Sequence, residues 1–329
     1  MSIFEEVDNI KRPAASGLRA VMGGGGGGSS EGIIYNFTNC GSTSKIGPSA
    51  SNIANTYIGT NLDGTVSWKS NGMQVWTVPY DGIYQFLVVG ASGGIGKKYN
   101  TPGFGSIMQG ELFLTAGTVL DITVGQKGDN STGGSAYYGG GGGGLSMVVD
   151  SNNAAYPIIV AGGGGGSADS ICSSRNANTL TFGLDGKLPN NGDGGAPRYK
   201  GGAGQYGAGG CGYTEQGGST SYALGGHNYT GGHSGGTPYT GAGAGGFGGG
   251  GGGFAGAGGG GGYGGGGAGG YSPGGGAGGG GSYLNPALSN TQQTAGVNTG
   301  HGSVTITAFI SSGSVGASLI IPVRKSVRL

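Results

Sequence analysis

Charged residues, helix-forming segments and long apolar runs are all scarce in this sequence. Only 9% of its 329 residues are charged, against about 25% in an ordinary globular domain. The formal net charge of +1 gives no electrostatic reason to expect nucleic acid as a partner. No apolar run reaches the roughly 18 residues of a membrane-spanning helix, so we expect no membrane insertion. Too few helix formers follow residue 22 to build a doubly wound enzyme core.

Cysteine is rare as well. Cys40, Cys172 and Cys211 are far apart and odd in number, so they form neither a metal-binding pair nor an even disulfide framework. We expect them to be small, buried apolar residues. The opening residues MSIFEEVDNIKR contain acidic side chains and no apolar core of secretory type, so we expect no signal peptide.

One glycine motif resembles a nucleotide-binding turn. Gly90–Gly96 follows an apolar segment, as in the cofactor turn of short-chain dehydrogenases. A phosphate site of that type needs a helix N-terminus immediately after the glycines, but Pro102 and two more glycines follow instead. We therefore expect no dinucleotide, and no cofactor of another kind.

Two histidines lie close together in the sequence. Five residues separate His227 and His233, and the neighbouring residues that could complete a metal site are Cys211 and Glu215. Because this ligand set is poor, we expect the histidines to be polar loop residues rather than metal ligands. No nucleophile with a base partner and no close pair of carboxylates is evident. The sequence predicts no enzymatic activity.

Alternating apolar residues predict a mainly β fold. Strand-like segments, separated by turn residues, occur at 33–37, 73–78, 83–90, 111–114, 119–125, 145–150, 157–162 and 303–310. Seven or eight short strands with turns between them are typical of an antiparallel sandwich or jelly roll. Residues 83–89 are apolar on both faces, which predicts a central strand that is covered on both sides.

Glycine is abundant where these strands are absent. The sequence has 91 glycines, 43 of them within the 80 residues from 201 to 280, and no Asp, Glu, Lys or Arg from Gln216 to Val323. Such composition is usual in flexible linkers. Ordering 43 glycines costs roughly 20–40 kcal/mol more than ordering alanines, at about 0.5–1 kcal/mol each. Disorder is therefore expected unless a regular interaction offsets this cost.

A regular spacing of aromatic residues favours order. Tyrosine and phenylalanine recur from Tyr199 to Tyr283 at a mean spacing of about eight residues. Eight residues of extended left-handed helix span about 25 Å, at roughly 3.1 Å per residue. Without side chains, such segments can pack at backbone contact and bond to one another laterally. We predict a bundle of polyglycine-II helices with an aromatic residue near each chain reversal.

The N-terminus contains the one helix-like segment. Apolar residues repeat at helical spacing opposite a charged face, and a six-glycine tether follows. The segment either docks on an assembly or is a frayed terminus. The expected docking residues are Ile3, Phe4, Val7, Ile10, Leu18 and Val21.

These patterns divide the chain into four parts. We expect a docking segment and glycine tether over residues 1–28, and a β-sandwich over 29–166 and 300–312. A glycine-rich insertion occupies 167–299, and residues 313–329 form a tail.

Several runs resemble the glycine-rich domain of anaplastic lymphoma kinase ectodomains. They are Trp76–Tyr84, Val88–Ala91, Gly139–Gly144, Pro157–Gly162 and His301–Ile306. The resemblance implies a jelly roll of the tumour-necrosis-factor type with inserted polyglycine-II helices. Similar domains occur in microbial and phage proteins, and the insertion also resembles the tip adhesins of T-even phage long tail fibres. There, aromatic loops at the end of a polyglycine bundle contact the host receptor.

The combined expectation is a non-enzymatic receptor-binding adhesin, on a virion surface or outside cells. Its partners are other virion or assembly proteins, through residues 1–22 and possibly the tail 313–329, and a host glycan or protein. By analogy with other jelly rolls we expect a homo-oligomer. The expected receptor contacts are Tyr206, Tyr213, Tyr222, His227, Tyr229, His233 and Tyr239, unless they pack on the bundle flank instead. An alternative is a structural subunit of an extracellular filament or matrix without a receptor; ice binding is disfavoured by the scattered threonines.

Overall fold

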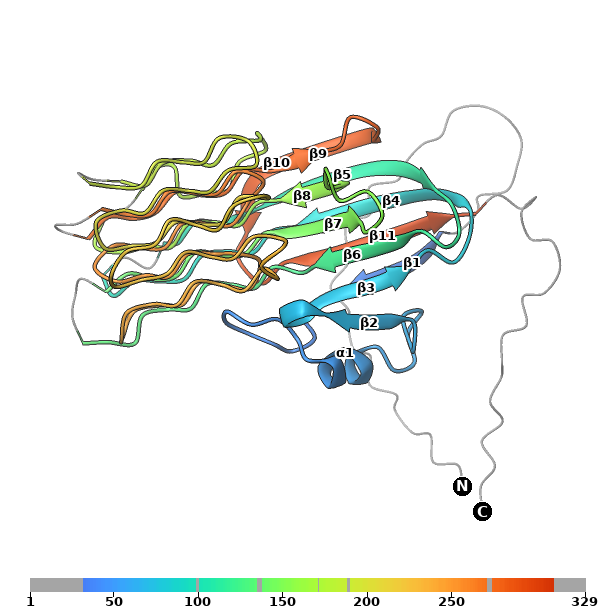
Figure 1. Cartoon of the computed structure of the whole chain (residues 1–329), viewed down its shortest axis with the longest axis horizontal. Helices are drawn as coiled ribbons and strands as arrows, with labels where there is room; N and C mark the ends of the chain where they lie inside the picture. The colour runs from blue at the N-terminus through green and yellow to red at the C-terminus, as the bar shows by residue number, and fades with distance from the viewer. Residues whose placement is uncertain are drawn as a thin grey trace, which may run out of the picture.

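The computed structural model describes residues 32–98, 101–134, 138–170, 172–187, 190–270 and 274–310, in which eleven strands form two antiparallel sheets (Figure 1). The first sheet has the order β1 (Ile33–Phe37), β11 (Ser303–Phe309), β4 (Gly82–Val89), β5 (Gly105–Leu114) and β10 (Ser289–Asn298). The second has the order β2 (Val66–Lys69), β3 (Met73–Thr77), β6 (Val119–Thr123), β7 (Ser146–Asp150), β8 (Ile159–Ala161) and β9 (Tyr283–Leu284). The predicted mainly β, sandwich-like fold is confirmed.

The core lies between the two sheets. It is made of the side chains at alternate positions of the strands, which point inward. Trp76 of β3 is 1% exposed and is surrounded by aromatic rings from the first sheet. Its ring centroid lies 4.6 Å from that of Tyr35, 5.9 Å from Phe37 and 6.3 Å from Tyr84. This aromatic contact joins β1, β3 and β4 at one point of the sandwich.

Strand β4 is central in its sheet, as predicted, but only one of its faces is covered. Tyr84, Phe86 and Val88 are fully buried. On the opposite face, Ile83 is 42% exposed and its cross-strand partner Phe113 is 60% exposed. The prediction of two covered faces is wrong because, in the described part of the chain, the second sheet packs on the inner face alone.

The short helical elements and the neighbouring strand β2 gave no clear signal in the sequence. Helix α1 (Ala50–Thr56) begins at the cap residue Ser49, whose side chain accepts a hydrogen bond from the Asn52 amide. The helix buries a single apolar side chain, Ile53, so it has no repeating apolar stripe to detect. A 3₁₀ turn, Ser70–Gly72, joins β2 to β3. The helix expected near the N-terminus lies outside the described residues.

The glycine-rich segments continue directly from the strands. After β4, β6 and β8 the chain runs on into glycines that lie side by side at one end of the sandwich (Figure 1). These segments are cross-linked by backbone hydrogen bonds, for example from Gly94 to the carbonyl of Gly141 (2.8 Å) and from Gly143 to that of Gly164 (2.8 Å). The sheet geometry therefore sets the positions of the first glycine segments.

Between β8 and β9 the described residues contain no helix or strand, yet their backbone amides have specific partners. Gly163 donates to the carbonyl of Gly261 (2.8 Å), and Gly260 donates to that of Gly278 (3.0 Å). The segments approach so closely that a Cβ on Gly260 would lie 2.1 Å from the Gly163 carbonyl oxygen. A flexible linker would not have these fixed contacts, and glycine is required because any side chain would separate the segments.

The chain returns to the two sheets earlier in the sequence than expected. Strands β9 and β10 fall inside the range 167–299 assigned to the insertion, yet β9 pairs with β8 and β10 pairs with β5. The insertion thus ends before Tyr283. β10 escaped notice because Ser289–Asn298 is polar and none of its residues is buried, so it has no apolar alternation.

Replacing Gly260 with alanine tests the close approach. We expect Gly260→Ala to lower the free energy of unfolding by about 1–3 kcal/mol, because the added methyl forces neighbouring backbone apart. Urea unfolding measures the change. Gly134→Ala is the matched control, because a Cβ there meets nothing within 4 Å. Equal unfolding midpoints for the two variants would show that the glycine segments are not packed in this way.

Candidate functional site

The predicted contact residues separate into two groups at opposite ends of the insertion. Tyr206, Tyr222 and Tyr239 lie together at the end remote from the sheets, whereas Tyr213 and Tyr229 pack near β7. Successive aromatic residues alternate between the two ends because each glycine segment crosses the insertion once. The spacing of the aromatic residues in the sequence indicates where the chain reverses, but it does not show at which end of the insertion each reversal lies.

The remote group forms a cluster of five rings, named here the tip cluster. Phe254 is its centre, with ring-centroid distances of 4.2 Å to Tyr239, 5.1 Å to Tyr222, 5.4 Å to Tyr206 and 6.2 Å to Tyr138. Tyr138 and Phe254 were not among the expected contacts. Phe254 belongs to the regular aromatic series, and Tyr138 directly precedes the run Gly139–Gly144, so both carried a usable signal.

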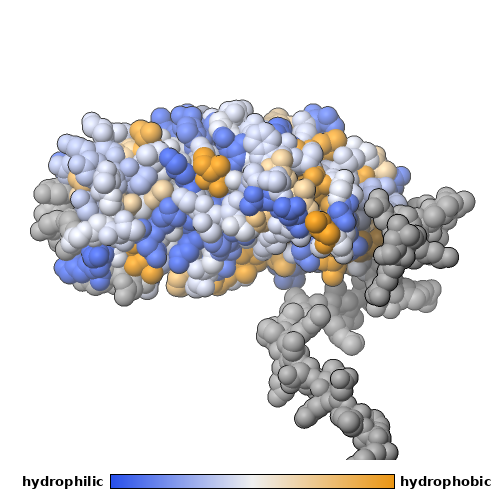
Figure 2. Space-filling model, turned by 90° about the horizontal axis from the view of Figure 1, so that it is seen from below, coloured by the Kyte–Doolittle hydropathy of each residue, from blue (hydrophilic) through white to orange (hydrophobic). Residues whose placement is uncertain are grey.

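The tip cluster presents apolar surface to solvent. Tyr222 is 47% exposed, Tyr239 is 40% exposed and the adjacent Leu224 is 51% exposed. Flat aromatic rings with hydroxyl groups suit a ligand that has both apolar faces and polar groups, such as a sugar. Elsewhere, on the coloured surface seen from below in Figure 2, apolar residues form several small groups rather than one continuous patch.

The group near the sheets is a stack of tyrosines, named here the tyrosine ladder. Tyr229 stacks on Tyr213 (5.7 Å), Tyr213 on Tyr263 (6.1 Å), and Tyr263 on Tyr283 (4.3 Å). Part of it packs on the side of the second sheet that faces away from the core. The apolar residues of this cluster are Leu145, Met147, Val149, Val160 and Cys211.

Two expected receptor contacts are buried in this region. Tyr213 is 4% exposed and donates to the carbonyl of Ala154 (2.6 Å), and His233 is fully buried. The prediction that these side chains meet a receptor is wrong. They are held against the sheet because the reversals at this end must cover the apolar outer face of β7 and β8.

A buried carboxylate fixes one end of the ladder. Asp121 of β6 is 1% exposed and accepts hydrogen bonds from the Lys69 ammonium (2.5 Å) and from the Tyr229 hydroxyl. Lys69 also lies 5.6 Å from the centre of the Tyr229 ring. Burial raises the pKa of the Tyr229 hydroxyl, and the hydrogen bond to Asp121 raises it further, so Tyr229 remains a hydrogen-bond donor.

His227 and His233 lie in different surroundings and form no common site. His227 shares a hydrogen bond with the Ser234 hydroxyl through Nδ1. Burial lowers the pKa of His233 to about 3, and neither ring nitrogen has a hydrogen-bond partner among the described residues. His233 is therefore a buried neutral residue, not the exposed polar loop residue that was expected. In the described part of the chain, no three His, Cys, Asp or Glu side chains are grouped to hold a metal ion.

The nucleotide-like glycine turn has a structural role. The amides of Ala91, Gly93 and Gly94 donate to the carbonyls of Gly144, Gly103 and Gly141 respectively. These donors are not free to bind phosphate, and no helix follows them within the described residues. All three cysteines are buried and unpaired, as predicted.

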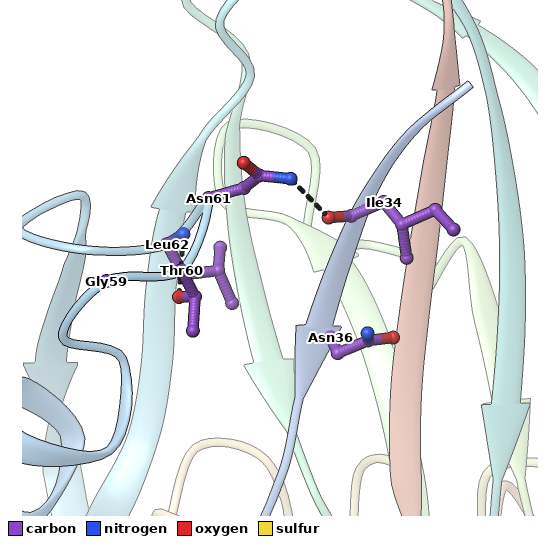
Figure 3. A pocket seen from close by; sticks show the side chains of 6 residues that line it. All are labelled: Ile34, Asn36, Gly59, Thr60, Asn61 and Leu62. Atoms are coloured by element: carbon purple, nitrogen blue, oxygen red, sulfur yellow. Dashed lines mark hydrogen bonds between the residues drawn. The ribbon is translucent and has the colours of Figure 1, made fainter. Parts of the chain in front are cut away.

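A cavity of about 330 Å³ lies on the sandwich beside β1 (Figure 3). It is lined by Ile34, Asn36 and residues 59–62. The Asn61 side-chain amide points across it and donates to the Ile34 carbonyl (3.0 Å). No ionisable side chain lines the cavity, so we assign it no chemistry.

No protein-family model matches this chain. Among curated proteins, the chain is similar to the leukocyte tyrosine kinase receptor of mouse (Mus musculus), with 31% identity over 101 residues. The matched part covers 30% of this chain and only 11% of the receptor. This receptor belongs to the anaplastic lymphoma kinase family, so the comparison supports a resemblance to that family over 30% of the chain. None of the described helices is long and apolar enough to cross a membrane.

Removing the Tyr229 hydroxyl tests the buried carboxylate. We expect Tyr229→Phe to lower the free energy of unfolding by about 1–3 kcal/mol, because Asp121 loses a donor that water does not replace. Urea unfolding is the measurement. Tyr222→Phe, at an exposed ring, is the control and should leave stability unchanged. If Tyr229→Phe left the free energy of unfolding unchanged, the hydrogen bond to Asp121 would not stabilise the ladder.

The burial of His233 predicts acid sensitivity. The unfolded chain binds a proton at this histidine below about pH 6.5, whereas the folded chain does so only near pH 3. Stability is therefore lost as pH falls from 6.5 towards 3. Asparagine tolerates the positive φ of 58° at this position, so His233→Asn should lose less stability between pH 7 and pH 4.5 than the unmodified protein.

Thermal unfolding at the two pH values measures this difference. His227→Asn, at a half-buried histidine, is the control and should behave like the unmodified protein. Parallel pH dependence in all three proteins would contradict the buried neutral state of His233.

Proposed function

We propose that this protein is a non-enzymatic attachment protein of the tail-fibre type, carried on a virion surface or acting outside cells. It would dock through the sandwich end and use the tip cluster to bind a glycan on a target surface. The single observation that carries the proposal is the five-ring tip cluster at the far end of a long glycine-rich insertion, with Tyr222 and Tyr239 exposed. A cluster of this kind needs a reason other than packing, because it covers no sheet and lies where apolar surface costs stability.

We propose further that the insertion is a bundle of polyglycine-II helices. Support comes from segments that bond to more than one neighbour: Gly142 donates to Gly251 and accepts from Gly246. In a β-ladder of the usual kind each residue bonds within one plane, whereas threefold rods can bond in several directions. A Cβ on Gly142 would lie 1.9 Å from the Gly259 carbonyl oxygen, which fits rods in backbone contact.

The arrangement of the chain supports a molecule with two different ends. Ile33 pairs with Ala308, so the described chain enters and leaves at the same end of the sandwich, away from the glycine segments (Figure 1). Half-exposed Ile83 and Phe113 lie at that end. The proposed docking segment 1–22 and the tail 313–329 connect there, although both lie outside the described residues.

The two resemblances fit the two parts of this proposal. The sequence runs that resemble the receptor family lie in the strands and in the glycine segments next to them, and the resemblance to phage tail-fibre tips concerns the insertion. In those tips, aromatic loops contact the host. A sugar ring is the favoured ligand here because the cluster combines flat apolar faces with hydroxyl groups.

Two ring deletions at the tip test the function. We expect the double variant Tyr222→Ala, Tyr239→Ala to bind an array of immobilised microbial and animal glycans at least tenfold more weakly than the unmodified protein. Fluorescently labelled full-length protein is the reagent. Tyr199→Ala is the control, because Tyr199 is 54% exposed but lies outside the tip cluster.

Point variants are preferable to removing residues 167–299, since that deletion would also remove β9 and β10. Circular dichroism should show the same fold in each variant. Undiminished glycan binding by the double variant would contradict the role of the tip cluster. If the protein bound cell-surface proteins and no glycan, the ligand of the tip cluster would be a protein receptor instead.

A further inference from the structure

Two lysines that belong to no ion pair within the described residues lie on the flanks of the tip cluster. Lys97 is exposed, and its backbone amide donates to the carbonyl of Tyr138 (3.0 Å), a member of the cluster. Lys45 reaches the other flank, where its ammonium donates to the Thr237 hydroxyl (3.0 Å), two residues before Tyr239. Neither ammonium forms an ion pair within the described residues.

The carboxylates in the surroundings are already occupied. Asp169 is buried and pairs with Lys98 (2.8 Å). Asp129 accepts from the Ser44 hydroxyl (2.7 Å), in a pocket that it shares with Lys127 and His301. Three of the five rings follow Glu215, in a segment without a charged residue from Gln216 to Val323. Neither of these carboxylates forms an ion pair with Lys45 or Lys97, so both ammonium groups are available to an anion.

We infer that the ligand of the tip cluster is an acidic glycan. Sugar rings would stack on the exposed faces of Tyr222 and Tyr239, and an anionic substituent would lie against Lys45 or Lys97. A carboxylate, phosphate or sulfate group on the sugar provides the same negative charge. The inference rests on the proposed function and narrows its ligand to one chemical class.

The tyrosine rings and the lysines would contribute differently to the binding of a glycan. Stacking on a ring is insensitive to charge, so the tyrosines bind neutral and acidic sugars alike. Each ammonium can donate a hydrogen bond to any sugar oxygen, but only an anionic substituent adds charge–charge attraction to that bond. Because both lysines are near the surface, their contribution falls as salt screens it.

The test is a glycan array with matched members: neutral backbones and the same backbones carrying carboxylate, phosphate or sulfate. We expect the full-length protein to prefer the acidic members by about two- to fivefold for each lysine engaged, and to lose this preference between 50 mM and 500 mM salt. Lys45→Gln, Lys97→Gln should bind acidic and neutral members equally, with neutral binding unchanged. Separate arms for the three anionic groups identify which of them is recognised.

Lys200→Gln is the matched control, because Lys200 is exposed but pairs with Glu215 (3.9 Å) away from the cluster. It should retain the full preference, and urea unfolding should give equal midpoints for all variants. Equal binding of acidic and neutral glycans by the unmodified protein, or an equal loss in Lys200→Gln, would overturn the inference and leave the proposed function standing. Failure to bind any glycan would overturn the proposed function itself.

Discussion

Lateral hydrogen bonding between bare backbones is the interaction on which the rest of the molecule depends. The glycines of the insertion sacrifice more conformational freedom than other residues do on folding. Close backbone contact offsets this loss of entropy. Amide and carbonyl groups of different segments form hydrogen bonds of about 2.8–3.0 Å, at a spacing that leaves no room for a Cβ. Charge is excluded for the same reason, because an ionised side chain inside this array would have neither space nor water. The buried alanines Ala168, Ala257 and Ala277, from three different segments, pack together in one small apolar cluster.

The sandwich and the insertion depend on each other. Strands β4, β6 and β8 lead into the first glycine segments and fix their spacing, so the array does not have to nucleate alone. In return, reversals of the insertion fold back over the outer face of β7 and β8, where Tyr213 and Tyr263 cover residues that solvent would otherwise reach. The buried Asp121, with Lys69 and Tyr229, fixes that covering at one point.

The sequence reveals the fold wherever apolar residues alternate, and fails where they do not. Leu120, Ile122 and Val124 belong to a segment with a clear two-residue period, and all three lie in the core. Helix α1 and strand β10 have no such pattern, since one buries only Ile53 and the other buries nothing. The aromatic spacing indicates where the chain turns, but an end that meets a sheet and an end that meets solvent have the same local sequence. Tyr213 and Tyr222 can be told apart only once the number of crossings back to the sheet is known.

The alternation of reversals has an evolutionary consequence. Each outward crossing and its return form a closed unit that starts and finishes beside the sheet. A whole unit can therefore be gained, lost or exchanged by recombination within repetitive codons while the register of every strand is preserved. A change of a single crossing would instead bring the chain out at the wrong end. The loops carrying Tyr206, Tyr222 and Tyr239 can therefore be exchanged as whole units without a change in the sheets that support them.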